Sequence, residues 1–152
     1  MSNSIYEQEL SHYYTVWHAY NYVYSEWAKE HGLSVNGLLF LCAIHDNNGS
    51  CTQKMISSQW MIPKQTVNMV LKDFESKGFV EQTPMPEDKR NKLIRFTESG
   101  EAYAESIVSE LRKAEIYATK KIGVERMRQL SDTLSSFMEL FREAENSHEN
   151  NG

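Results

Sequence analysis

The chain has 152 residues, a formal net charge of −5 and a hydrophobic fraction of 40%, which suits one compact domain or one protomer of an oligomer. No apolar run is long enough to span a membrane and the N-terminus lacks a signal-peptide pattern, so we expect a cytoplasmic protein with no membrane partner. Cys42 and Cys51 do not have the spacing of a metal site or a CxxC motif, and they do not suggest a disulfide framework.

Charge is distributed unevenly along the chain. Residues 60–97 carry +2, from seven basic and five acidic residues, whereas residues 1–59 carry −3 and residues 98–152 carry −4. An acidic protein is not expected to coat nucleic acid non-specifically. The positive segment indicates instead where a phosphate backbone would be contacted.

Residues 5–30 form the first predicted helix. Bulky apolar residues recur in it at spacings of three and four, a heptad-like stripe of Leu10, Tyr13, Trp17, Tyr20, Tyr24 and Trp27. A terminal helix this apolar needs a large partner surface. The sequence therefore predicts a dimerisation helix within residues 1–33.

Two shorter helices are predicted next, each beginning at a capping hydroxyl. Ser34 is expected to cap a helix that ends near residue 44, with Leu38, Leu41, Cys42 and Ile44 in the core. A turn-rich loop at residues 46–50 follows, and Cys51 after it is assigned neither to the core nor to the surface. Thr52 then caps a helix over residues 53–59.

The helix over residues 63–77 is predicted to read DNA. Val67, Val70, Leu71 and Phe74 form its apolar stripe, and Gly78 can adopt the left-handed conformation that ends a helix. The opposite face carries Lys64, Gln65, Asn68 and Lys72. Lysines can hold phosphates, and Gln or Asn can bond bidentately to adenine in a major groove.

Residues 79–82 and 92–96 are rich in strand formers, and the loop between them contains two prolines. This pattern predicts a hairpin. The loop ends in a positively charged run at residues 89–92. A helix followed by a basic-tipped hairpin indicates a winged helix, in which the hairpin reaches the neighbouring backbone or minor groove.

Two long helices are predicted after the hairpin. Thr97 caps the first, which runs to about residue 121, and Gly123 separates it from the second, over residues 124–144. The second repeats apolar residues at three and four: Met127, Leu130, Leu134, Phe137 and Phe141. We expect residues 98–146 to complete an intertwined dimer with residues 1–33, and residues 147–152 to be a disordered tail.

Three motifs in the centre of the chain resemble the MarR (multiple antibiotic resistance regulator) family of transcription regulators. GFV at residues 78–80, PEDKR at residues 86–90 and IRFTESG at residues 94–100 are similar to the family pattern G-L-V … D-P-x-D-x-R … L-T-x-x-G. The resemblance covers about residues 10–141. Met69 and Gln82 stand where the family usually has Arg, Met61 replaces a usual Gly, and Pro63 a usual Ser.

The resemblance implies a fold that is mostly α with a small β-wing: a winged helix-turn-helix over residues 34–97 between the dimerisation helices. It implies a homodimer that binds double-stranded DNA at a pseudo-palindromic operator and represses, or less often activates, nearby genes. Asp88 is expected to orient the wing arginine. The predicted DNA-contact residues are Ser34, Thr52, Gln53, Lys64, Gln65, Thr66, Asn68, Lys72, Lys89, Arg90 and Lys92.

The resemblance also raises the question of what the protein senses. It implies a small lipophilic or phenolic effector, for which Trp17, His18 and Phe40 are candidate wall residues, with ordinary core or dimer contacts as the alternative. A metal or metal cofactor is not expected, because the histidines are scattered and form no HxxxH pair. Redox sensing is disfavoured, because the first helix has no cysteine and Cys42 is expected in the core.

Two other classes of protein remain as alternatives. A winged helix can serve protein–protein contact without DNA. An enzyme is disfavoured, because the sequence has no glycine-rich phosphate loop, G-x-S-x-G or H-E-x-x-H.

Overall fold

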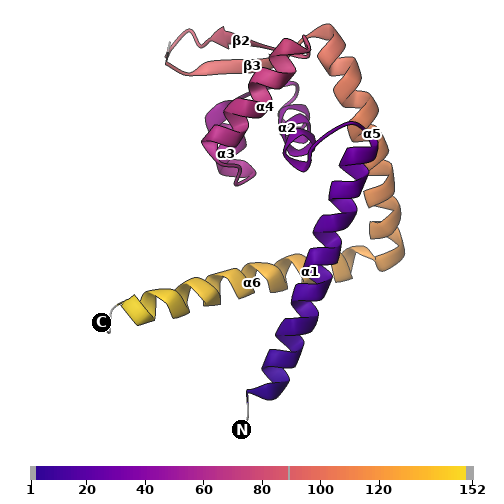
Figure 1. Ribbon diagram of the computed structural model, residues 1–152, viewed down its shortest axis with the longest axis vertical. Helices are drawn as coiled ribbons and strands as arrows, with labels where there is room; N and C mark the ends of the chain where they lie inside the picture. Colours follow the sequence, from indigo (N-terminus) through magenta and orange to yellow (C-terminus); the bar gives the residue numbers. More distant parts are fainter. Residues whose placement is uncertain (1–2, 89, 150–152) are drawn as a thin grey trace. The chain divides into compact units, whose positions relative to one another are not determined.

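The computed structural model describes residues 3–88 and 90–149, which divide into two compact units at residue 108. The elements are α1 Ser4–Glu30, α2 Val35–Asp46, β1 Ser50–Thr52, α3 Gln53–Gln59, α4 Lys64–Ser76, β2 Val80–Pro84, β3 Lys92–Phe96, α5 Glu98–Ile122 and α6 Val124–Glu149 (Figure 1). The prediction of a mostly helical fold with a small β-wing is confirmed. None of the described helices is long and apolar enough to cross a membrane.

The core of the first unit lies between α2, α3, α4 and the sheet. Phe40 of α2 and Phe74 of α4 stack at its centre, with ring centroids 5.3 Å apart, and each is 1% exposed. Val67 and Leu71 of α4 are buried beside them, as their spacing predicted. Burying a side chain of this size contributes roughly 1.5–3 kcal/mol. This packing holds the buried face of α4 against α2 and leaves its polar face at the surface.

Backbone caps fix where the helices of this unit begin and end. Three hydroxyls accept backbone N–H donors at 3.0–3.1 Å, Ser34 from Gly37, Thr52 from Met55 and Thr97 from Gly100, so all three predicted caps are confirmed. Gly78 has a φ of 73° and ends α4, as predicted.

The sheet has three antiparallel strands in the order β1-β3-β2. β3 has its predicted bounds and pairs with β2 from Val80 opposite Phe96 to Pro84 opposite Lys92. β1 was not predicted, because three residues are too few to show alternation; pairing with β3 decides its conformation. Cys51 lies opposite Ile94 in this pairing and is 0% exposed, which places in the core a residue whose exposure the sequence had left open.

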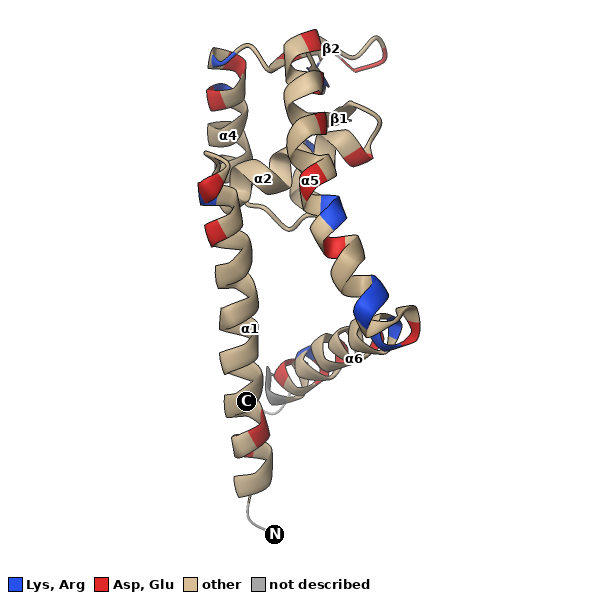
Figure 2. Ribbon diagram, turned by 90° about the vertical axis from the view of Figure 1, so that its right-hand side faces the viewer, with Lys and Arg blue, Asp and Glu red and all other residues tan. Residues whose placement is uncertain are grey.

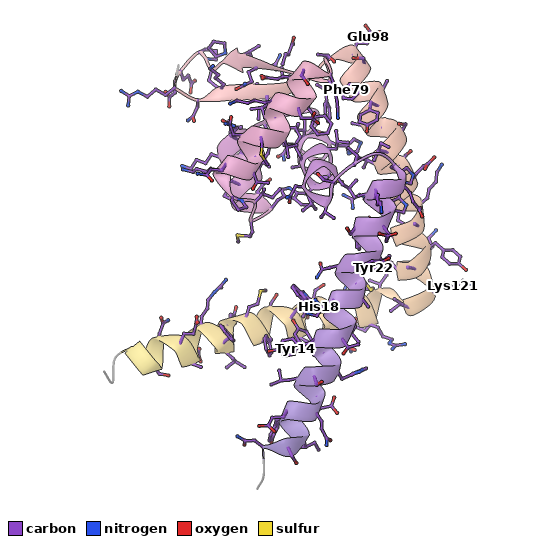
Figure 3. The ribbon with its side chains drawn as sticks, in the orientation of Figure 1. Tyr14, His18, Tyr22, Phe79, Glu98 and Lys121 are labelled. Atoms are coloured by element: carbon purple, nitrogen blue, oxygen red, sulfur yellow. The ribbon has the colours of Figure 1, made fainter. Side chains whose placement is uncertain are left out.

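α1 is a long helix with most of its surface exposed. Figure 2 shows that it carries no charged residue between Glu9 and Glu26. Tyr14, His18 and Tyr22 follow one another along it (Figure 3), and the two tyrosines are 55% and 64% exposed. Ala28 is the α1 residue that is completely buried. Of the predicted stripe, Leu10, Trp17 and Tyr20 are 37%, 48% and 59% exposed, so the rest of the first unit leaves much of this apolar surface uncovered.

α6 extends further than predicted. The helix continues to Glu149, which corrects both the end expected near residue 144 and the disorder expected for residues 147–149. Residues 145–149 contain neither Gly nor Pro, and the Ser147 hydroxyl donates to the Ala144 carbonyl at 2.8 Å. Nothing in this stretch therefore stops the helix. Residues 150–152, the rest of the expected tail, lie outside the described residues.

Met61, in the turn between α3 and α4, has a left-handed backbone with a φ of 51°. This conformation costs an L-residue roughly 1–2 kcal/mol, and the Met61 side chain, 82% exposed, has little packing to offset the cost. We expect Met61→Gly to raise the free energy of unfolding by about 0.5–1 kcal/mol, measured by urea denaturation. Asn48→Gly, at a φ of 57°, is the control and should gain less, because asparagine tolerates this region. A less stable Met61→Gly variant would contradict this account.

Candidate nucleic-acid interface

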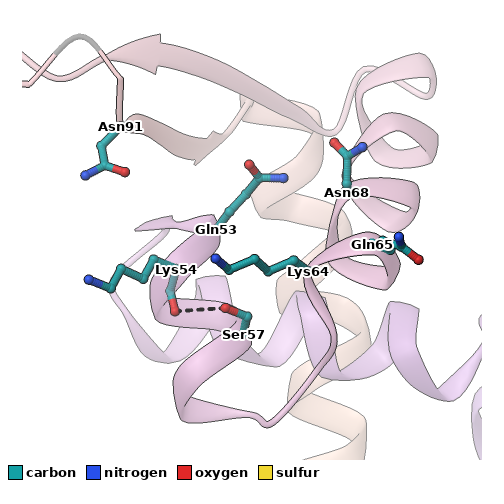
Figure 4. Close-up of a pocket in the computed structure, with 7 residues that line it drawn as sticks. All are labelled: Gln53, Lys54, Ser57, Lys64, Gln65, Asn68 and Asn91. Carbon is teal, nitrogen blue, oxygen red and sulfur yellow. Dashed lines mark hydrogen bonds between the residues drawn. The ribbon is translucent and has the colours of Figure 1, made fainter.

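A hollow of about 470 Å³ lies between α3, the start of α4 and the loop that precedes β3. The residues that line it are Gln53, Lys54, Ser57, Lys64, Gln65, Asn68 and Asn91 (Figure 4). None of the seven is acidic. The hollow therefore combines two positive charges with four amides, which offer hydrogen-bond donors and acceptors together.

The amphipathic pattern of α3 and α4 explains why these side chains converge. Lys54 lies on the side of α3 opposite Ile56, the α3 residue that is buried in the core. On α4, Asn68 lies away from the buried Val67 in the same manner. Each helix therefore turns its polar side towards the hollow as a consequence of burying its apolar side.

The two lysines of the hollow come from different helices. Figure 4 shows Lys64 extending from the start of α4 across α3 in the direction of Lys54. Two positive charges that line one hollow favour an anion in it. A phosphate oxygen is such an anion, and the N-terminal end of α4 adds a favourable dipole.

Asp88 determines the geometry of the wing tip. Its carboxylate accepts hydrogen bonds from the backbone N–H of Arg90 at 3.0 Å and from the side-chain amide of Asn91 at 3.3 Å. The Asn91 backbone N–H also donates to the Asp88 carbonyl at 3.1 Å. An aspartate that bonds the N–H two residues later closes an Asx-turn. Asp88 thus positions Arg90 through the backbone of the turn.

The structure brings together four of the predicted DNA-contact residues, Gln53, Lys64, Gln65 and Asn68, at the hollow. The others are spread over the first unit. Lys72 is exposed further along α4, and Arg90 and Lys92 are exposed on the wing. Lys89 lies outside the described residues.

The three hydroxyl residues on the predicted contact list do not line the hollow. Ser34 and Thr52 have capping roles, and Thr66 is half-buried on α4. Their contact with DNA stays a prediction.

Sequence reasoning missed three residues that line the hollow, Lys54, Ser57 and Asn91. Lys54 and Ser57 could have been found by placing the polar side of α3 opposite Ile56. Asn91 could not, because its position depends on how the wing folds back beside α3 and α4.

The predicted effector wall does not assemble in the first unit. Phe40 stacks on Phe74 in the core, whereas Trp17 is 48% exposed and contacts His18 edge-on at 5.0 Å. Trp17 lies about 16 Å along α1 from the buried Ala28. Phe40 is therefore a core residue, the alternative that the sequence had left open. Among the described residues, no three His, Cys, Asp or Glu are placed to hold a metal ion.

Burial raises the pKa of the Cys51 thiol to about 11. The folded protein holds this proton more tightly than the unfolded chain does. The contribution of Cys51 to the free energy of unfolding is therefore lost as the pH rises from 9.0 towards 11. A protonated thiol is a poor nucleophile. We expect Cys51 to resist alkylation in folded protein at about pH 8 and to react readily in guanidinium chloride. Mass spectrometry of digested samples measures both, and rapid labelling in native buffer would contradict a buried, inert thiol.

The fold and the hollow define a winged helix-turn-helix protein, with α3 and α4 as the helix pair and the β2–β3 hairpin as the wing. Residues 31–91 match the model of the MarR family. This match, with the regulators described next, confirms the resemblance to MarR family transcription regulators that the motifs indicated.

Known proteins similar to this chain include a transcriptional regulator and solved structures of MarR family regulators. The transcriptional regulator SarZ from Staphylococcus epidermidis is 27% identical over 115 residues, 76% of each chain. A MarR family regulator from Neisseria meningitidis is 26% identical with a TM-score of 0.80, over 92% of this chain and 98% of that one. A cysteine-to-serine mutant of E. coli MarR, complexed with operator DNA, has a TM-score of 0.67 at 22% identity, over 88% of this chain and 95% of that one.

Proposed function

We propose that this chain is a homodimeric repressor that binds double-stranded DNA at a pseudo-palindromic operator. The observation that supports the proposal most directly is the basic, amide-lined hollow at the start of α4. In helix-turn-helix proteins the N-terminal residues of the recognition helix contact base edges, and lysines and helix ends contact phosphates. The similar protein from E. coli has been crystallised with operator DNA, which supports the proposal that this chain binds DNA with the same fold.

Binding to DNA should depend steeply on salt. The logarithm of the affinity falls linearly with the logarithm of salt concentration, with a slope set by the number of phosphates contacted. Fluorescence anisotropy with a labelled random duplex and with genomic fragments measures this slope. A winged helix used for protein contact alone would show no such salt-dependent binding, and that result would overturn the proposal.

A charge-matched pair of variants links the binding to the hollow. Lys64→Glu should lower affinity about tenfold or more, because it places a carboxylate in the hollow. Lys113→Glu, exposed on α5 in the second unit, changes net charge equally and should leave affinity within about twofold. Equal losses would show that net charge matters and the hollow does not.

The homodimer is expected to form through α1, α5 and α6, within residues 1–33 and 98–146. Large exposed apolar side chains occupy α1, as described above, and α6, where Leu140 and Phe141 are 63% and 56% exposed. Surfaces of this kind mark interaction sites. A two-fold dimer also presents two recognition helices to a palindrome.

Light scattering coupled to size exclusion should give a mass of about twice 17.7 kDa. Phe141→Glu should shift the protein towards monomer, because it would place a charge in the apolar contact. Glu143→Gln, exposed on the same helix, is the control and should remain dimeric. A stable monomer at micromolar concentration that still binds DNA tightly would contradict the homodimer.

A further inference from the structure

We propose that the bases read by α4 belong to A·T pairs, with adenines opposite Gln65 and Asn68 and a thymine methyl group against Met69. This inference rests on the proposed function and deepens it, because it names the class of DNA sequence that the operator half-site contains.

The first support is the absence of arginine from the reading unit. Arg90 is the first arginine of the chain, so α3, the turn and α4 contain none. Arginine bonded to guanine O6 and N7 is the commonest specific contact in the major groove, and its counterpart for adenine is Gln or Asn bonded to N6 and N7. The N-terminal half of α4 offers Gln65 and Asn68 for this purpose. Both are exposed, one turn apart.

Lysine can also bond to guanine, so the placement of the lysines matters. Lys64 and Lys54 both line the hollow, and Lys64 extends along it in the direction of Lys54 (Figure 4), so each can contact a phosphate. Lys72 lies about 10 Å along the helix axis from Gln65, beyond the N-terminal turns that reach base edges. These positions suit contact with the backbone, which leaves the amides to read the bases.

Met69 supplies the second support. Positions 65, 69 and 72 are spaced by four and three, so Met69 lies on the same side of α4 as Gln65 and Lys72. It is 69% exposed although it is apolar. Apolar contact with the C5-methyl group is how side chains recognise thymine, and the flexible thioether of methionine adapts to such a surface. An exposed methionine between polar neighbours on the reading side fits this role.

Selection from random duplexes with the full chain, followed by sequencing, tests the base composition. We expect enriched half-sites with A·T pairs at the neighbouring positions that α4 covers. In a selected duplex, 7-deazaadenine at those positions should weaken binding about tenfold, because it lacks the N7 acceptor. Uracil in place of the contacted thymine should weaken binding by about threefold, because it lacks the methyl group. The Met69→Ala variant should not distinguish uracil from thymine.

Met69→Arg tests the same position in the opposite direction. The new guanidinium should move the preference at that base pair to guanine. Ser76→Arg adds the same charge about 10 Å further along α4 and should raise affinity for all duplexes without changing base preference. If both arginines act alike, Met69 does not face a base and the inference is wrong.

The remaining outcomes separate this inference from the proposed function. Half-sites rich in G·C under α4, or selected duplexes indifferent to both base analogues, would overturn the A·T inference while salt-dependent DNA binding stands. The absence of salt-dependent binding to any duplex would overturn both.

Discussion

Gly100→Ala is expected to lower the free energy of unfolding by about 3 kcal/mol or more, the largest loss among the substitutions considered. A Cβ at this position would overlap the carbonyl oxygen of Phe79 and lie 2.6 Å from its carbonyl carbon. Both are backbone atoms, so no change of rotamer relieves the overlap. The only relief is to move α5 away from the start of β2.

The clash between a Cβ at position 100 and the Phe79 carbonyl would lie at the junction of α4, the wing and α5. The Thr97 backbone N–H donates to the Phe79 carbonyl at 3.0 Å, and its hydroxyl donates to the Gly78 carbonyl at 2.6 Å. Displacing α5 would stretch both bonds at the point where the recognition helix ends. DNA affinity should therefore fall together with stability in the Gly100→Ala variant.

Urea denaturation followed by circular dichroism measures the effect. Gly37→Ala is the matched control, because the nearest atom to its new Cβ is the Ser34 hydroxyl oxygen at 3.2 Å, a side-chain atom. We expect a change of no more than about 1 kcal/mol there. If the Gly100→Ala variant is insoluble while the Gly37→Ala variant is soluble, the result agrees with a backbone overlap at Gly100. Equal free energies of unfolding in the two variants would contradict it.

Arg90→Ala is expected to weaken binding to every duplex by a similar factor, about tenfold, and to lower the salt slope by about one. Arg90 is exposed at the wing tip, where the turn closed by Asp88 positions it. A guanidinium is planar and weakly hydrated, so it can enter a narrow minor groove, where the potential is most negative. Contact of this kind strengthens binding without distinguishing most sequences.

Gln65→Ala and Asn68→Ala should behave differently from Arg90→Ala. Each is expected to cost about 1–3 kcal/mol on the operator, to cost little on a random duplex, and to relax the preference at particular base pairs. The comparison needs one operator, its single-base variants and a random duplex, each at two salt concentrations. Unchanged base preference in both variants would show that this side of α4 is not the reader.

Local patterns predicted most of the helical framework of this chain. The caps at Ser34, Thr52 and Thr97 and the glycine at Gly78 placed helix ends correctly, because each acts through hydrogen bonds or backbone angles within a few residues. The period of Val67, Leu71 and Phe74 also identified the buried side of α4, and with it the polar side that lines the hollow.

Features that depend on distant segments were decided by the tertiary structure. β1 forms because β3, some forty residues later, pairs with it, and the same pairing buries Cys51 and suppresses its ionisation. Phe40 could not be assigned to the core from its spacing alone, since the partner that buries it is Phe74. Asn91 joins Lys54 and Lys64 only when the wing folds. Sequence by itself thus determined where most of the helices begin and end and which sides they bury, α6 being the exception in its end. Pairing and packing between remote residues determined which polar side chains meet in one place.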